Sequence, residues 1–124
     1  MRLLAAGQLT SYEITLGKVP SLNTFYSGKH WLVRKRHKDN FVAEALAQLE
    51  KYDCVPITDV RVVARVNYKY DVDNSIMAIK FGLDALKVYG AIVDDSRKYV
   101  SQIKILYDPT IESNTAKIIF EGVS

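Results

Sequence analysis

The sequence predicts a single α/β or α+β domain in which a mixed β-sheet carries two helices. The chain has 124 residues, which suits one compact domain, and we expect that domain to span residues 1–124. Its hydrophobic content of 48% and charged content of 25% are those of an ordinary globular protein. Segments of two-residue periodicity alternate with segments of helical periodicity in the order β-α-β-α-β-β, an alternation typical of helices packed on a sheet.

The first part of the chain predicts one strand and one helix. Residues 12–16 alternate and are rich in β-formers, which predicts a strand, and residues 20–23 end it in a turn. From residue 33 to residue 52 the chain has good helix formers and apolar residues at helical spacing, namely Phe41, Ala45, Leu46 and Leu49. Residues 53–56 break this helix.

Residues 60–73 have the clearest strand pattern. Apolar and aromatic residues occupy the even positions, and mostly polar residues occupy the odd ones. Because successive side chains of a strand point to opposite faces, we expect the even residues to pack on the core. The odd face is basic in its middle and acidic at its end, through Arg61, Arg65, Lys69, Asp71 and Asp73.

A second helix is predicted at residues 74–88, with an apolar stripe formed by Ile76, Ile79, Leu83 and Leu86. Good N-cap residues stand at 73–75, and Gly90 suits the C-terminal cap. Two β-rich runs, 99–107 and 115–120, close the chain. We expect residues 108–114 to join these two strands as a hairpin.

Composition excludes several classes of protein. The net charge is only +3, so overall charge does not by itself indicate a nucleic-acid partner. Cys54 is the one cysteine, which excludes an internal disulfide and favours a reducing compartment. Residues 1–7 carry an apolar run too short for a signal peptide, and no apolar stretch approaches the roughly 20 residues of a membrane span. We therefore expect a cytoplasmic protein.

Two pairs of aspartates form the candidate metal site. Asp71 and Asp73 end the predicted long strand, and Asp94 and Asp95 begin the next one. A right-handed crossover would return that strand beside its predecessor, so three or four carboxylates could meet at one sheet edge. Clustered carboxylates need a cation, and their hard oxygens select Mg²⁺ or Mn²⁺, which can activate water against a phosphodiester. From spacing alone, capping and turn formation are the favoured explanation.

Lys80 adds a cation to this pattern. It follows Asp73 by seven residues, or two helical turns, and so shares a helix face with it. It could support a phosphate or a developing charge. It could also simply pair with Asp84 at i, i+4, and the two roles are compatible.

Taken in order, these residues resemble the signature of the RusA-like endodeoxyribonucleases, small dimeric enzymes of phages and prophages that resolve Holliday junctions. The resemblance spans residues 12–107 and implies a RusA-like fold, a homodimer, Mg²⁺ as cofactor, and branched DNA in a bacterial cell as substrate. It rests on Asp71-Val72-Asp73-Asn74, Lys80, Asp84-Ala85-Leu86, Gly90 and Asp94-Asp95-Ser96, with Ser21-Leu22-Asn23 and Gly28-Lys29-His30-Trp31 upstream.

The resemblance also implies residue roles. Asp71, Asp73 and Asp95 would be the essential metal-binding carboxylates, and Asp94 would assist them. Lys80 would match the lysine required for cleavage, because it stands four residues before Asp84-Ala85-Leu86. The chain departs from the founding type of the family here. In that type the lysine follows the DxDN motif closely, whereas in this chain Met77 occupies that position and the lysine comes three residues later.

A basic stretch between residues 29 and 38 is the candidate DNA-binding segment. Lys and Arg side chains on phosphates release counterions, and Phe25, Tyr26 and Trp31 could stack on bases or open a junction. Cations are unfavourable at a helix N-terminus, which suggests a purpose other than helix stability. The alternative is a solvated helix start with one core aromatic. The assigned residues are Lys29, His30, Trp31, Arg34, Lys35, Arg36, Lys38, Asn23 and Asn74.

Three functions follow as hypotheses. The first is a Mg²⁺-dependent endonuclease that cuts branched DNA during recombination and repair. The second is a non-catalytic DNA-binding protein descended from such a nuclease. The third is a metal-dependent transferase that uses Asp71-Val72-Asp73 as a DxD motif, although the chain has no Gly-rich phosphate loop. Arg61, Arg65 and Lys69 either extend the DNA-binding surface or lie under a helix or a partner chain.

Overall fold

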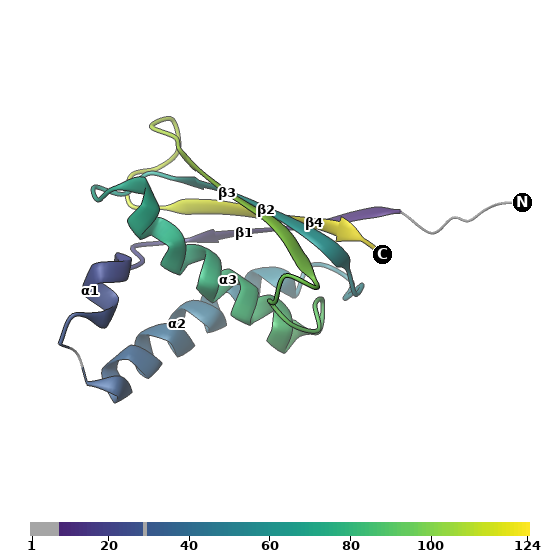
Figure 1. The fold of residues 1–124 in the computed structure, drawn as a ribbon, viewed down its shortest axis with the longest axis horizontal. Helices are drawn as coiled ribbons and strands as arrows, with labels where there is room; N and C mark the ends of the chain where they lie inside the picture. Colours follow the sequence, from purple (N-terminus) through teal and green to yellow (C-terminus); the bar gives the residue numbers. More distant parts are fainter. Residues whose placement is uncertain (1–7, 29) are drawn as a thin grey trace, which may run out of the picture.

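The structure is a computed structural model that describes residues 8–28 and 30–124. The N-terminal apolar run at residues 1–7 and the candidate DNA-binding residue Lys29 lie outside the described residues. The elements, in chain order, are β1 (Leu9–Leu16), α1 (Leu22–Tyr26), α2 (Trp31–Leu49), β2 (Thr58–Val66), the 3₁₀ helix η1 (Val72–Ser75), α3 (Ile76–Tyr89), β3 (Val100–Tyr107) and β4 (Ala116–Val123). The predicted α+β class, with a mixed sheet, is confirmed (Figure 1).

The sheet has the strand order β1-β4-β2-β3. β4 is antiparallel to both β1 and β2, and β2 is parallel to β3. The predicted hairpin between the last two strands is therefore wrong, because β2 lies between them. The connection instead wraps around the end of β2, where the Asp108 N–H donates to the Val66 carbonyl at 2.9 Å and the Asn114 N–H donates to the Asn67 carbonyl at 2.8 Å.

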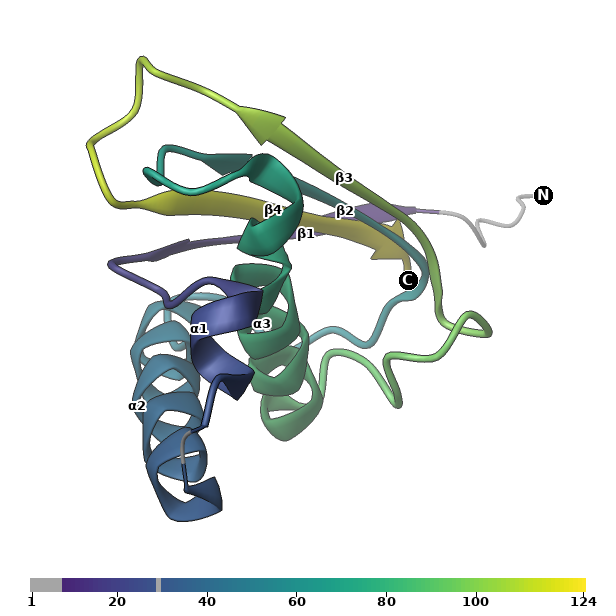
Figure 2. The same ribbon diagram turned by 60° about the vertical axis from the view of Figure 1, so that its left-hand side comes forward.

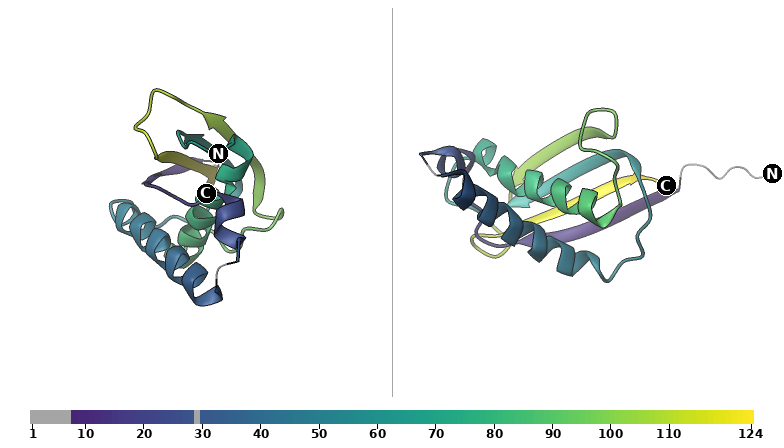
Figure 3. Two further views of the ribbon diagram at one scale, coloured as in Figure 1. Left: turned by 90° about the vertical axis from the view of Figure 1, so that its left-hand side faces the viewer. Right: turned by 90° about the horizontal axis from the view of Figure 1, so that it is seen from below.

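One face of the sheet carries the helices, and the other face carries none among the described residues (Figures 1 and 3). The even positions of β2 and the residues that follow it point to the helical side, as predicted: Val60, Val62, Ala64, Val66 and Tyr68 are buried. α3 is buried around most of its circumference because it packs against both the sheet and α2. Gly82 lets it approach the sheet, since a Cβ there would lie 2.6 Å from Phe120 Cζ.

The helices begin and end near the predicted positions. α2 starts two residues before the predicted start, where the His30 imidazole Nδ1 accepts a hydrogen bond from the Leu32 N–H at 3.2 Å. Gly90 ends α3 with a left-handed backbone (φ 96°), as predicted. The short helix α1 was not predicted. It is capped by Ser21, whose hydroxyl accepts from the Thr24 N–H at 3.1 Å.

Strand β2 is shorter than the pattern at 60–73 predicts. The ladder ends at Val66, after which the Tyr68 hydroxyl donates to the Gly17 carbonyl at 2.6 Å and the Tyr70 hydroxyl donates to the Val19 carbonyl at 2.7 Å. These two bonds draw the chain toward the end of β1. Residues 71–75 then turn into η1 rather than extend the sheet. No helix in the described part of the chain is long and apolar enough to cross a membrane.

Candidate active site and nucleic-acid interface

Asp71 and Asp73 lie beyond the C-terminal end of β2, and both side chains are exposed. Asp71 is the N-cap residue of η1, and Asp73 lies in its first turn. Asn74, a candidate DNA contact, is half-buried and donates its backbone N–H to the Asp71 carbonyl at 3.0 Å. In a strand, residues two apart point to the same face, but a 3₁₀ helix has about three residues per turn. The expectation that the two carboxylates share one face therefore does not apply here.

Asp94 and Asp95 lie before the N-terminal end of β3. Because β2 and β3 are parallel, with Val60 opposite Val100 and Val66 opposite Tyr107, β3 begins at the other end of the sheet from the strand end that precedes Asp71. The 14 residues of α3 separate the two pairs along the chain, but the Asp95 side chain lines the same small cavity as Met77, in the first turn of that helix. Figures 1 and 2 show η1 at one end of α3 and the segment 91–99 near the other.

The two pairs therefore do not follow one strand end as expected, but Asp95 lines a cavity with Met77, at the start of α3, and the convergence of the carboxylates stays a prediction. Within residues 8–28 and 30–124, no group of three or more His, Cys, Asp or Glu side chains is arranged to hold a metal ion. A crossover connection brings the second strand beside the first, but the residues that precede the second strand follow the end of the connecting helix rather than the end of the first strand.

The second aspartate pair already has a cationic neighbour. Lys87 Nζ lies 3.6 Å from Asp95 Oδ2 and 3.5 Å from Asp84 Oδ1, and Lys38 Nζ lies 3.6 Å from Asp84 Oδ2. The pKa of Asp94 is lowered, first by the hydrogen bond from the Asp95 backbone N–H and last by the charge of Lys87. These charges stabilise the ionised carboxylates at this end of α3 without a bound metal. The predicted metal-binding roles of Asp94 and Asp95 stay predictions.

Lys80 lies with this second group of charges. It lines a small cavity of about 190 Å³ together with Lys38, Asp84 and Asp95, and its side chain is exposed. Met77, at the position of the family lysine, is buried beside the same cavity. In the described part of the chain, Asp84 pairs with Lys38 and Lys87 rather than with Lys80. The sequence suggested that Lys80 shares a helix face with Asp73, and the structure places it in one cavity with Asp95.

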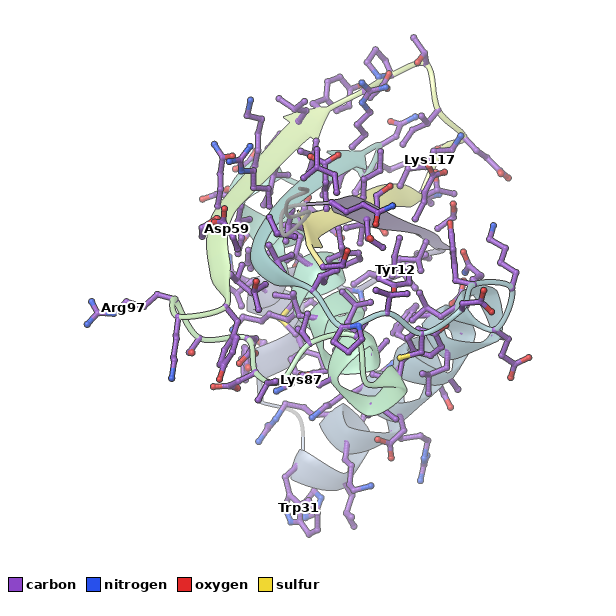
Figure 4. All side chains as sticks on the ribbon, turned by 90° about the vertical axis from the view of Figure 1, so that its right-hand side faces the viewer. Tyr12, Trp31, Asp59, Lys87, Arg97 and Lys117 are labelled. Atoms are coloured by element: carbon purple, nitrogen blue, oxygen red, sulfur yellow. The ribbon has the colours of Figure 1, made fainter. Side chains whose placement is uncertain are left out.

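The aromatic residues near the start of α2 divide into buried and exposed ones. Phe25 is only 6% exposed and packs edge-on against Phe81 at 5.6 Å, so its ring is not presented at the open surface and lines a cavity instead. Tyr26 is 56% exposed and Trp31 is 58% exposed. Figure 4 shows Trp31 at the tip of α2, pointing away from the sheet. These two rings are available to meet a ligand.

The basic residues of α2 lie on more than one face of the helix. Arg34 lies over the Tyr26 ring, 5.9 Å from its centre. Lys35 pairs with Asp39 at 2.8 Å, and Lys38 pairs with Asp84 on α3. No acidic residue occupies the first turn of α2, so nothing in that turn offsets the unfavourable dipole. Arg36 is exposed, as is Asn23 on α1, which packs against η1.

Sequence patterns did not reveal the cavity of about 480 Å³ beside Asp71. It lies between the β1–α1 connection and residues 68–70. Phe25, Tyr68 and Tyr70 provide aromatic walls, and the last two rings stack with their centres 5.0 Å apart. Burial raises the pKa of both tyrosine hydroxyls, and each donates to a backbone carbonyl. Lys18, His37 and Lys69 also line it, and none of its lining residues is acidic.

The helix-free face of the sheet is a second shallow surface. Arg61 and Arg65 lie on it, as the period-two pattern predicted, together with Lys117 and two acids, Glu13 and Glu121. Its centre is apolar, formed by Val63 and Ile119. Lys69 does not belong to it, because β2 has ended and the side chain lines the 480 Å³ cavity instead. The mixed charge of this face distinguishes it from the wholly cationic rim of that cavity.

The residues present fit a magnesium ion that is held by two carboxylates together with a phosphate of the substrate. Mg²⁺ keeps several waters and is commonly held by one or two carboxylates plus substrate phosphates. Asp71 and Asp73 are both exposed at the end of β2, so they could hold such an ion once a phosphate arrives. An ion held by all four aspartates of one molecule does not fit this arrangement.

Comparisons with known proteins add no assignment to these observations. No family model matches the chain, and no curated protein matches it. The similarity to RusA-like enzymes therefore rests on the motif residues alone.

Proposed function

We propose that the chain is a Mg²⁺-dependent endodeoxyribonuclease that hydrolyses phosphodiester bonds in branched DNA, including four-way junctions. The observation that carries the proposal is the placement of Asp71 and Asp73. Both are exposed, and Asp71 directly follows Lys69 and Tyr70, which line a cavity whose charged side chains are all cationic. This combination suits a polyanion that delivers a phosphate to a carboxylate-bound ion. The order of the motif residues, which resembles the RusA-like signature, supports the same function.

In this proposal the residues of the chain bind and orient the DNA. Asp71 and Asp73 would hold Mg²⁺ (or Mn²⁺), which when bound supplies an activated water and neutralises charge on the phosphate. Lys18 and Lys69 would contact the backbone on one side, and the basic residues of α2 would contact it beyond Tyr26 and Trp31. A homodimer would present two such sites, which matches the two-fold symmetry of a four-way junction.

Cleavage of labelled DNA tests the proposal. Purified protein with Mg²⁺ is expected to make paired nicks in a four-way junction and to leave a linear duplex intact. Asp73→Asn is expected to abolish the nicks and to keep the affinity for the junction. Asp59→Asn is the matched control, because Asp59 is an exposed aspartate at the start of β2 whose left-handed backbone (φ 51°) asparagine tolerates. Equal cleavage by wild type and Asp73→Asn would refute the proposal.

Asp95→Asn tests the role implied by the resemblance. Loss of cleavage equal to that of Asp73→Asn would show that Asp95 serves the same reaction. Unchanged cleavage would indicate that Asp71, Asp73 and the substrate phosphate hold the ion without Asp95.

One observation favours a second candidate, a DNA-binding protein without catalysis. Lys87 already neutralises Asp95, and no three acidic side chains of the described residues form a metal group. Junction binding with no nicks under Mg²⁺ or Mn²⁺ would support this alternative.

A further inference from the structure

We propose that the 480 Å³ cavity beside Asp71 binds one unstacked nucleotide, with its base between the aromatic walls and its phosphate at the cationic rim. The inference rests on the proposed function for its substrate class, DNA. It adds a binding pocket that selects where the strand can be cut. A cavity of this volume lies within the range of about 300–1,000 Å³ typical of small-molecule sites.

The walls suit a planar, uncharged ring. Phe25, Tyr68 and Tyr70 supply the aromatic surface, and Val19 and Pro20 complete the apolar lining. The hydroxyls of Tyr68 and Tyr70 already donate to the carbonyls of Gly17 and Val19, at 2.6 and 2.7 Å, so their rings are fixed in place. Rings held in this way stack on a base with little loss of side-chain entropy, and stacking tolerates any base because each has a π-face.

The rim suits a phosphate. Lys18 and Lys69 are exposed cations, His37 is half-buried, and none of the residues that line the cavity is acidic. Ser21, Thr24 and Asn114 add polar atoms to the lining. A neutral ring would gain nothing from the lysines, and a bare phosphate would gain nothing from the aromatic walls. A nucleotide uses both.

The position of the cavity connects it to the candidate metal ligands. Lys69 and Tyr70 line it, and Asp71 is the next residue. A DNA strand with one base in the cavity would continue along its backbone past Asp71 and Asp73. In a regular duplex the bases are stacked and paired, whereas at a branch point a base is displaced at lower cost. The cavity would thereby restrict cleavage to branched DNA.

Titration of the full chain with mononucleotides, followed by the backbone amide signals in NMR, tests the inference. The experiment is done in EDTA, so that it reports binding whether or not the protein cuts DNA. The probes are thymidine 5′-monophosphate, thymidine and inorganic phosphate. We expect the monophosphate to shift the amides around Gly17, Lys69 and Tyr70 at millimolar concentration, and the other two probes to bind at least tenfold more weakly.

Two variants and one control complete the test. Lys69→Glu is expected to weaken the monophosphate about tenfold, since it replaces a rim cation by an anion. Thr24→Phe, at an exposed position in the lining, is expected to fill the cavity and abolish the shifts. Lys117→Glu, on the helix-free face, is expected to change neither.

Three outcomes would overturn the inference. They are the absence of shifts at the cavity, equal shifts with inorganic phosphate, and shifts that survive Thr24→Phe in a folded variant. Junction cleavage without nucleotide binding would refute this pocket and leave the nuclease proposal in place. Nucleotide binding without cleavage would support this pocket and refute the nuclease proposal.

Discussion

Replacement of Lys87 by methionine tests whether this lysine, rather than a metal, neutralises the carboxylates at the far end of α3. Lys87 Nζ lies 3.5 Å from Asp84 and 3.6 Å from Asp95, and its side chain is 33% exposed. Methionine keeps most of the apolar stem of the side chain and removes the charge. The expected results are a loss of stability in low salt and a new response to divalent cations.

The magnitude follows from the exposure of the two ion pairs. Exposed pairs contribute about 0.2–1 kcal/mol each, because solvent screens them and two side chains must be ordered. Two partly exposed pairs that share one lysine therefore give a loss of about 1 kcal/mol. For a domain of this size that loss lowers the melting temperature by roughly 3–5 °C. Asp84 keeps Lys38 at 3.6 Å, which limits the loss.

Thermal unfolding at 20 mM and at 500 mM NaCl measures this effect, with Lys35→Met as control. Lys35 is closer to its partner, at 2.8 Å from Asp39, but that pair is more exposed and the variant is expected to change stability by less than about 0.5 kcal/mol. Addition of 10 mM Mg²⁺ is expected to stabilise Lys87→Met more than the wild type. Equal stability of Lys87→Met and wild type at low salt would refute the argument. Stabilisation of the wild type by Mg²⁺ that disappears in Asp95→Asn would also refute it.

Three further predictions concern folding, ionisation and DNA contact. Gly82→Ala is expected to destabilise the protein by about 1–2 kcal/mol in urea unfolding, because the Cβ clash with Phe120 Cζ at 2.6 Å costs more than the roughly 1 kcal/mol gained in helix propensity. Gly17→Ala, where the nearest atom is 4.0 Å away, is its control and is expected to stay within about 0.5 kcal/mol of the wild type. Thr110→Val is expected to raise the pKa of Asp108 in an NMR titration, because the Thr110 hydroxyl and N–H donate to that carboxylate and hold its pKa low. Since the folded-state pKa is the lowered one, the stabilising contribution of Asp108 is present above its unfolded pKa and is lost as the pH falls through the folded value, and an unchanged pKa in the variant would contradict this account. Trp31→Ala is expected to leave the melting temperature unchanged, because the ring is 58% exposed, and to weaken junction binding roughly 5- to 150-fold, which corresponds to about 1–3 kcal/mol of base stacking. Leu32→Ala, an exposed neighbour without a ring, is expected to bind normally, and equal affinities of the two variants would contradict a stacking role.

Periodicity predicted those parts of the fold that depend on one element at a time. The buried even positions of β2 and the Gly90 cap follow from local side-chain direction and backbone sterics, and both are confirmed. The pairing of β3 and β4 could not be predicted in this way. It depends on competition among strands for the position next to β2, which residues 108–115 decide by bonding to Val66 and Asn67.

The candidate site was predictable in its residue types and much less so in its arrangement. Asp71 and Asp73 are exposed beyond a strand end, as the motif suggested. The strand does not reach them, however, because the hydroxyls of Tyr68 and Tyr70 donate to backbone carbonyls of a loop that is distant in sequence. The alternation of Tyr68, Lys69 and Tyr70 was the one local signal of the cavity. We interpreted the tyrosines as core residues and the lysine as part of the sheet face, because nothing local shows that the chain leaves the sheet at Val66.

The position of α3, the helix between the two aspartate pairs, is a rigid property of the fold. α3 is buried between the sheet and α2, and Gly82 fixes it against Phe120 and Ile14, so its first turn is held in the core directly after Asp73 and η1. Asp95 lines the same small cavity as Met77 and Lys80, so the charges around Lys87 extend along α3 toward its first turn, which follows η1. If Asp71, Asp73 and Asp95 all prove essential for cleavage, we expect the pair of Asp95 with Lys87 to open, so that Asp95 can act with the other two carboxylates on one phosphate. If Asp95 proves dispensable, one exposed pair and the DNA itself are enough to hold the ion.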